Sequence, residues 1–306
     1  MTSAHQLGVE EVVARLRDLR NASLQQRHRD GRPPKLPSRE AITEIVGNLS
    51  AAMFPNRLGR PDLTDEGIDH YVGNLLDVAL HALNEQLRRE LLFVSNLDGL
   101  SQTDADRAAS ITREFARSLP RIRELLDTDI LAAYQGDPAA RSVDEVLICY
   151  PGVTAIAHYR MANVLYRLGV PLTARMIAEL AHSLTGIDIH PGAQIGERFF
   201  IDHGTGVVIG ETAIIGNNVR LYQAVTLGAK RFPAREDGSL VKGEPRHPIV
   251  EDDVVIYAGA TVLGRVTIGR GSTIGGNVWL TRSVPPGSNV SQAQTTDAVI
   301  GSGSGK

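Results

Sequence analysis

The chain has 306 residues, of which 42% are hydrophobic and 22% charged, and its formal net charge of −3 provides no basic field to hold a nucleic acid. This length suffices for about two domains with buried cores, and the single cysteine, Cys149, excludes an internal disulfide framework and favours a reducing compartment. Because no apolar run approaches the roughly 20 residues of a membrane span and the start lacks a secretory h-region, we expect a cytoplasmic protein.

Residues 1–185 contain stretches with helical periodicity separated by proline and glycine, and they are predicted to form an all-α domain. Apolar residues at three- and four-residue steps indicate an amphipathic helix over 9–26. After a proline-containing linker, Ser38 is expected to cap a second helix, and Thr64 or Asp65 to start a third. Further helices are predicted over roughly 104–118, 121–134, 142–168 and 171–184, separated by Pro120, Gly136–Pro138 and Gly169–Pro171.

In residues 186–306 aliphatic residues recur every six positions, with one eight-residue step between Ile201 and Ile209. Six residues suit a short strand and a tight turn, and three such units can close a triangular coil with the aliphatic side chains inside. Coils stacked at about 4.8 Å would pair their strands in parallel. We therefore predict a β prism, with ordinary β-hairpins as the weaker alternative. The recurring positions are Ile189, Ile195, Ile201, Ile209, Ile215, Leu221, Leu227, Val250, Ile256, Val262, Ile268, Ile274 and Leu280.

The repeat is interrupted once, between Leu227 and Val250. The intervening segment is polar and rich in proline and glycine, so we expect a loop extruded from the prism, with residues 229–245 forming its body. Insertions in solenoids map to loops, which often lie on the binding face.

Polar clusters at 186–192, 201–206 and 244–248 carry the candidate chemistry. Asp188 and His203 are nearly one coil apart and could be stacked neighbours. A carboxylate that contacts one imidazole nitrogen leaves the other as a base for a hydroxyl proton. The same residues could instead be solvated turn residues, and the spacing leaves this open.

Short motifs recur through the second half of the chain: Asp188-Ile-His-Pro, Asp202-His-Gly-Thr-Gly, Gly210-Glu-Thr, Val225-Thr-Leu-Gly, Arg246-His-Pro, Gly269-Arg-Gly and Val284-Pro-Pro. Taken together, these motifs resemble those of the serine O-acetyltransferases, a family of hexapeptide-repeat acyltransferases. The resemblance spans roughly residues 136–286, and Asp137-Pro138-Ala139 stands where the family has a serine-binding Asp-Pro-Ala. It implies an α+β fold in which an N-terminal helical domain (1–185) precedes a left-handed parallel β-helix with an extruded loop (186–306).

The resemblance implies direct transfer of an acetyl group from acetyl-CoA to the hydroxyl of L-serine in a ternary complex, as the first step of cysteine biosynthesis and without a metal. His203 would be the general base and Asp188 its orienting carboxylate. A serine zwitterion needs both anions and cations around it. The implied ligands are Asp137 and Asp202 for the ammonium group, and Arg246 and His247 for the carboxylate.

The resemblance also places CoA along the backbone at Gly228, Ala258 and Gly276. It implies homotrimers with sites between neighbouring prisms, or dimers of trimers joined through the helical domains, and inhibition by L-cysteine. Family tails that dock into O-acetylserine sulfhydrylase end in isoleucine, whereas this chain ends in Lys306, so this partner is the least supported expectation.

Three alternatives stay open from the sequence. Another hexapeptide acyltransferase, acting on a sugar or an amino substrate, would share the fold and the CoA groove. A β-helix metal lyase of the carbonic anhydrase type would need zinc ligands, for which His190, His203 and His247 are the candidates. A non-catalytic scaffold is the third alternative, because fold alone does not prove function.

Overall fold

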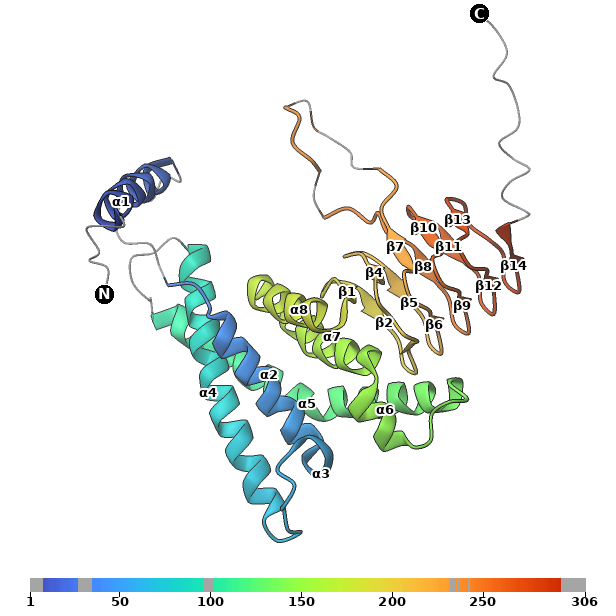
Figure 1. Ribbon diagram of the computed structural model, residues 1–306, viewed down its shortest axis with the longest axis horizontal. Coiled ribbons are helices and arrows are strands. Elements are labelled where there is room, and N and C mark those ends of the chain that lie inside the picture. The colour runs from blue at the N-terminus through green and yellow to red at the C-terminus, as the bar shows by residue number, and fades with distance from the viewer. Residues whose placement is uncertain are drawn as a thin grey trace, which may run out of the picture.

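The computed structural model describes residues 8–26, 35–95, 102–231, 235, 237–241 and 243–292. A helical part leads into a stack of short strands (Figure 1). The tail beyond residue 292, to which the docking expectation refers, and most of the predicted linker lie outside these residues. The helices are α1 (Val9–Gln26), α2 (Arg39–Met53), α3 (Pro55–Leu58), α4 (Ile68–Ser95), α5 (Gln102–Gly136), α6 (Val143–Cys149), α7 (Pro151–Arg167) and α8 (Pro171–Thr185).

Three predicted helix boundaries are wrong, and two of them involve proline. The helix expected to start at Thr64 or Asp65 begins at Ile68. Helix α5 continues through Pro120, where a break was expected. Proline removes one backbone donor, but the apolar face of α5 stays buried on both sides of it, at Leu119 and Ile122. The single helix predicted over 142–168 is instead α6 and α7, because Pro151 starts a new helix at its first position, where the missing N–H costs nothing.

The strands form a left-handed parallel β-helix with three faces. We call face A the sheet β1-β4-β7-β10-β13, face B the sheet β2-β5-β8-β11, and face C the sheet β3-β6-β9-β12-β14. Their bounds are β1 (Asp188–Ile189), β2 (Gln194–Ile195), β3 (Phe200–Ile201), β4 (Val208–Ile209), β5 (Ile214–Ile215), β6 (Arg220–Leu221), β7 (Thr226–Gly228), β8 (Ile249–Val250), β9 (Val255–Ile256), β10 (Thr261–Leu263), β11 (Thr267–Ile268), β12 (Thr273–Ile274), β13 (Trp279–Leu280) and β14 (Asn289–Val290).

The hexapeptide prediction is confirmed strand by strand. Every one of the recurring aliphatic positions is the second residue of a strand from β1 to β13. All are buried in the prism except Ile195, which is half-buried and packs against the same core. The described residues between β7 and β8 leave the prism, as expected (Figure 1).

The prism corners position the polar clusters. The CA corner joins face C to face A and includes residues 202–207, 222–225, 257–260 and 275–278. The AB corner joins face A to face B and includes residues 190–193, 210–213 and 264–266, together with the extruded loop.

The helical part meets the first coil of the prism. Helix α8 ends at Gly186, whose φ of 70° is the left-handed conformation that glycine adopts freely, and the chain then enters β1. Tyr159 of α7 donates a hydrogen bond to the carbonyl of Ala193. Among the described residues, no helix is long and apolar enough to cross a membrane.

Candidate active site

His203 and Asp202 lie together at the CA corner, directly after β3. Asp202 is buried, whereas the imidazole of His203 is largely exposed, with its Nε2 atom 3.8 Å from Asp202 Oδ1. The backbone of His203 has a φ of 59°, which is uncommon for a residue with a Cβ. This conformation turns the chain at the corner and leaves the imidazole accessible to a ligand.

Asp137 approaches this corner from the loop that follows α5. Its Oδ1 atom accepts a hydrogen bond of 2.8 Å from the backbone N–H of Ala139, and its Oδ2 atom accepts one of 2.5 Å from the Tyr150 hydroxyl. The bond from Tyr150 holds the pKa of Asp137 below its usual value, and the same bond raises the pKa of Tyr150 to about 12. Asp137 is therefore a fixed anion at neutral pH.

Arg220 links Asp202 to the residue that precedes Asp137, and the sequence analysis did not identify it. Its guanidinium donates to Asp202 Oδ2 at 2.5 Å and to the carbonyl oxygen of Gly136 at 2.7 Å. An arginine on the outer surface of a hexapeptide strand gives no signal by itself, because the partners are distant in sequence.

Asp188 lies at the start of β1, and the strand pairing does not stack it on His203 as the 15-residue spacing of the two had suggested. The stacked register with His203 is wrong, because Asp188 pairs with Val208. The first coil needs 20 residues between the register partners Ile189 and Ile209, so it places His203 in the preceding turn. No hydrogen bond or ion pair within the described ranges joins the Asp188 and His203 side chains, and the orienting role of Asp188 stays a prediction.

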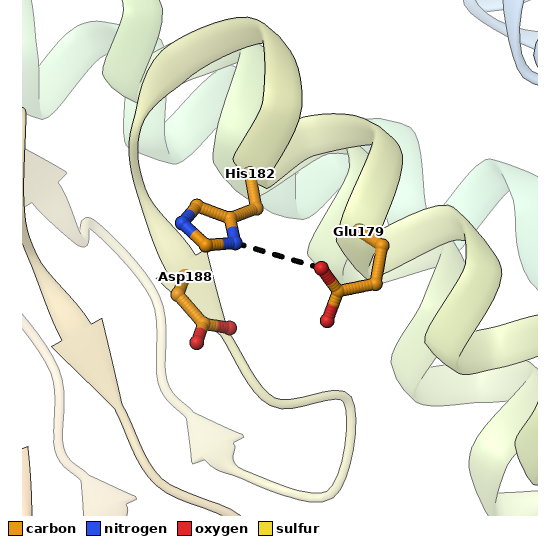
Figure 2. A group of neighbouring side chains, drawn as sticks. All are labelled: Glu179, His182 and Asp188. Atoms are coloured by element: carbon orange, nitrogen blue, oxygen red, sulfur yellow. Dashed lines mark ion pairs between the residues drawn. The ribbon is translucent and has the colours of Figure 1, made fainter.

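Figure 2 shows Asp188 beside two side chains of α8, Glu179 and His182. These residues place one potential ligand atom each within 4.8 Å of one another. Glu179 already accepts a hydrogen bond from Arg175 at 2.6 Å and lies 3.5 Å from His182 Nδ1. We interpret the group as a surface charge network.

Arg246 and His247 lie together at the AB corner. Arg246 forms an ion pair with Glu211 at 2.6 Å, and its backbone N–H donates to Thr212 Oγ1. The ring of His247 packs so closely over Gly210 that a Cβ there would lie 2.0 Å from His247 Cδ2. Glycine is therefore required beneath this histidine.

The contacts of His247 also fix its proton. Its Nδ1 atom accepts a hydrogen bond from the backbone N–H of Thr212 at 3.1 Å. A backbone N–H only donates, so the proton of the neutral imidazole lies on Nε2. Burial, and then the nearby Arg246, lower the pKa of His247 to about 4. At neutral pH His247 thus offers an uncharged N–H donor beside the Arg246 guanidinium, a combination suited to a carboxylate.

We expect the unfolding temperature to fall as the pH decreases from 6.5 toward 4. The folded state keeps His247 neutral down to about pH 4, while the unfolded chain binds a proton near the ordinary histidine pKa of 6.5. The stability from this depressed pKa is present above pH 6.5 and is lost across this window. Calorimetric scans of wild type and His247→Asn measure the effect, because the asparagine oxygen can replace Nδ1 as acceptor but does not titrate. Parallel curves for the two proteins would contradict the assignment.

The residues expected along the CoA groove fall at two places. Ala258 and Gly276 stack at the CA corner, where a Cβ on Gly276 would lie 3.3 Å from the Ala258 carbonyl oxygen. Gly228 ends β7 on the AB side of face A, opposite Leu263. The structure therefore brings two of these residues together and separates the third.

The site residues divide into two groups within one chain. Asp137, Asp202 and His203 are at the CA corner, whereas Arg246 and His247 are at the AB corner. Among the described residues, no hydrogen bond or ion pair connects the two groups. The histidines of the zinc alternative divide in the same way, with His190 at the AB corner and His203 at the CA corner.

Residues 247–282 match the family model described as bacterial transferase hexapeptide (six repeats). The chain is also 58% identical, over 88% of its length, to a serine acetyltransferase of Synechococcus elongatus, of which it covers 86%. The chain belongs to the serine acetyltransferase family. This membership removes the carbonic anhydrase and scaffold alternatives and confirms the resemblance seen in the motifs.

Solved structures of the serine acetyltransferase family share the fold. A serine acetyltransferase of Entamoeba histolytica, isoform 3 in complex with cysteine, aligns with a TM-score of 0.68 and 37% identity, covering 85% of this chain and 83% of its own. A soybean serine acetyltransferase complexed with serine aligns with a TM-score of 0.52 and 30% identity, covering 83% of this chain and 96% of its own.

Proposed function

We propose that this serine acetyltransferase transfers the acetyl group of acetyl-CoA to the hydroxyl of L-serine, giving O-acetylserine and CoA for cysteine biosynthesis. The observation that carries the proposal is the placement of two buried or hydrogen-bonded carboxylates, Asp202 and Asp137, beside the exposed imidazole of His203. A cationic amine bound by the carboxylates would hold its own hydroxyl near a base.

The reaction follows from this arrangement by direct transfer. His203 accepts the hydroxyl proton while the serine oxygen attacks the thioester carbonyl carbon. The tetrahedral intermediate collapses as the carbon–sulfur bond breaks, and the protonated imidazole returns the proton to the CoA sulfur. Neither the protein nor a metal forms a bond to the acetyl group. Asp188 is proposed to orient His203 when the substrates are bound.

The carboxylate of serine is assigned to Arg246 and His247. Arginine can hold a carboxylate with two parallel hydrogen bonds, and the Nε2–H group of His247 adds a third donor. Glu211, now paired with Arg246 at 2.6 Å, would share the guanidinium with the substrate.

This assignment requires a second copy of the chain. At least three residue rises of about 3.3 Å separate the AB and CA corners along face A, which is farther than one serine molecule can reach. We therefore propose a homotrimer in which the CA corner of one prism meets the AB corner of the next. In that arrangement acetyl-CoA would run along the interface past Ala258 and Gly276, with Gly228 supplied across it. Inhibition by L-cysteine is proposed at the same site, because cysteine differs from serine in one atom.

Asp137→Asn is expected to raise the KM for L-serine by about tenfold, because it removes one charge from a charge-assisted hydrogen bond to the ammonium group. The assay follows CoA release with L-serine, with a panel of sugars as the competing substrates. Asp144→Asn is the matched control, since Asp144 pairs with Arg57 in the helical part and lies outside the proposed site. Turnover with a sugar but not with L-serine would refute the proposed function.

A further inference from the structure

Arg220 occupies an unusual place for an arginine on a hexapeptide prism. It is the first residue of β6, on the outer surface of face C, where the end of α5 covers it. Its side chain is only 24% exposed. Arg270, by comparison, pairs with the prism carboxylate of Asp252 at an exposed position, whereas Arg220 bonds to both the prism and the helical part.

The guanidinium makes one contact to each part. Toward the prism, it donates to Asp202 Oδ2 at 2.5 Å. Toward the helical part, it donates to the carbonyl oxygen of Gly136 at 2.7 Å. Gly136 is the last residue of α5 and directly precedes Asp137, so Arg220 spans the two chain segments that carry the proposed ammonium ligands.

Aromatic rings hold the guanidinium in place. Its central carbon lies 4.9 Å from the ring centroid of Phe200 and 4.6 Å from that of Tyr222. The ring of Tyr222 in turn stacks on Tyr257, with centroids 5.0 Å apart and planes at 11°. Guanidinium groups are attracted to the faces of such rings, and a flat, forked cation is needed to fill this slot and bond in two directions.

The close approach of α5 depends on the absence of a side chain at Gly136. A Cβ at this position would lie 3.0 Å from Phe200 Cδ1 and 3.6 Å from Arg220 Nη1. The helix end is therefore shaped to bring its last carbonyl oxygen to Arg220. Because Asp137 is the next residue, the same contact also fixes the position of its backbone.

We propose that Arg220 is a positioning residue that sets the separation of Asp137 and Asp202 and thereby determines the affinity of the site for the ammonium group of L-serine. It occupies Asp202 Oδ2 and leaves Oδ1 directed toward His203, at 3.8 Å. It also reduces the repulsion between two like charges in one small site. This inference rests on the proposed function.

The test compares Arg220→Met and Arg220→Lys with wild type. Arg220→Met keeps much of the side-chain volume but loses both hydrogen bonds. We expect its KM for L-serine to rise about 10- to 100-fold, the effect of losing a charge-assisted hydrogen bond, while its KM for acetyl-CoA stays within about twofold. Arg220→Lys keeps the charge and can reach one acceptor at a time, so it should restore part of the serine affinity. Arg270→Met is the matched control, because Arg270 also pairs with a prism aspartate, Asp252 at 2.9 Å, but at an exposed position.

Calorimetric titration of L-serine separates this inference from the proposed function. Binding to wild type, with weaker binding to Arg220→Met and partial recovery in Arg220→Lys, supports the inference even without an assay of turnover. Unchanged serine affinity in Arg220→Met overturns it. Equal increases in both KM values, with a lower unfolding temperature and no recovery in Arg220→Lys, also overturn it, because a merely structural role would act in that way. Wild type that neither binds nor acetylates L-serine refutes the proposed function itself.

Discussion

His203→Ala is expected to lower kcat for serine acetylation by about 10²–10⁴-fold, the range over which a positioned base contributes. The serine hydroxyl is a poor nucleophile at neutral pH, and we assign no other group to accept its proton. The KM for acetyl-CoA should change little, because the imidazole is assigned to the serine hydroxyl and the CoA path to Ala258 and Gly276. The measurement is steady-state CoA release, with the unfolding temperature recorded for each variant.

The backbone at His203 dictates a second variant. Its φ of 59° favours residues that tolerate the left-handed region, and asparagine is among the most tolerant. His203→Asn should therefore keep the turn while losing the base, and it should be as inactive as the alanine variant. His81→Ala is the control, since His81 is exposed on α4 and contacts Asp77. A transfer rate that survives in both His203 variants would remove the proposed base.

The prism could be predicted from the sequence because the six-residue pattern that specifies each strand lies within a short stretch of the chain. Each strand needs one aliphatic residue every six positions, and positions such as Ile209 and Leu227 meet this need without reference to distant residues. The helix boundaries were less predictable, because proline gives the same signal at Pro120 and Pro151. The helix continues through Pro120 because its neighbours Leu119 and Ile122 are buried, and burial is a property of the packed structure.

The site was predictable in its motif residues but not in their contacts. The Asp188–His203 prediction failed because it assumed coils of constant length, whereas 20 residues separate the register partners Ile189 and Ile209 and 18 separate Ile209 and Leu227. Arg220 bonds to Gly136, which is 84 residues away in the chain. Nothing in a single sequence indicates that these two residues are neighbours in the fold.

Asp129 makes a further long-range contact that could not be predicted from the sequence. Its loss is expected to cause the largest decrease in the free energy of unfolding. Its side chain is 1% exposed and accepts two hydrogen bonds from the equally buried Arg160, at 2.6 and 2.9 Å, and one from the backbone N–H of Phe199. Arg160 also donates to the carbonyl oxygen of Gly196 at 2.8 Å. One ion pair therefore joins α5, α7 and the first coil of the prism.

Asp129→Ala is expected to lower the free energy of unfolding by about 3–5 kcal/mol, because it leaves the Arg160 guanidinium charged and buried without its partner. Urea unfolding measures the loss. Asp127→Ala is the matched control: Asp127 is two residues away on the same helix but pairs with Arg123 at a half-exposed position, where such a pair contributes about 1 kcal/mol or less. Similar losses in both variants would contradict the assignment. Unlike the His203 variants, Asp129→Ala should retain kcat for serine acetylation wherever it remains folded, because the Asp129–Arg160 pair has no hydrogen bond to the ligands at the CA or AB corner. The loss of stability and the loss of catalysis are therefore expected in different variants.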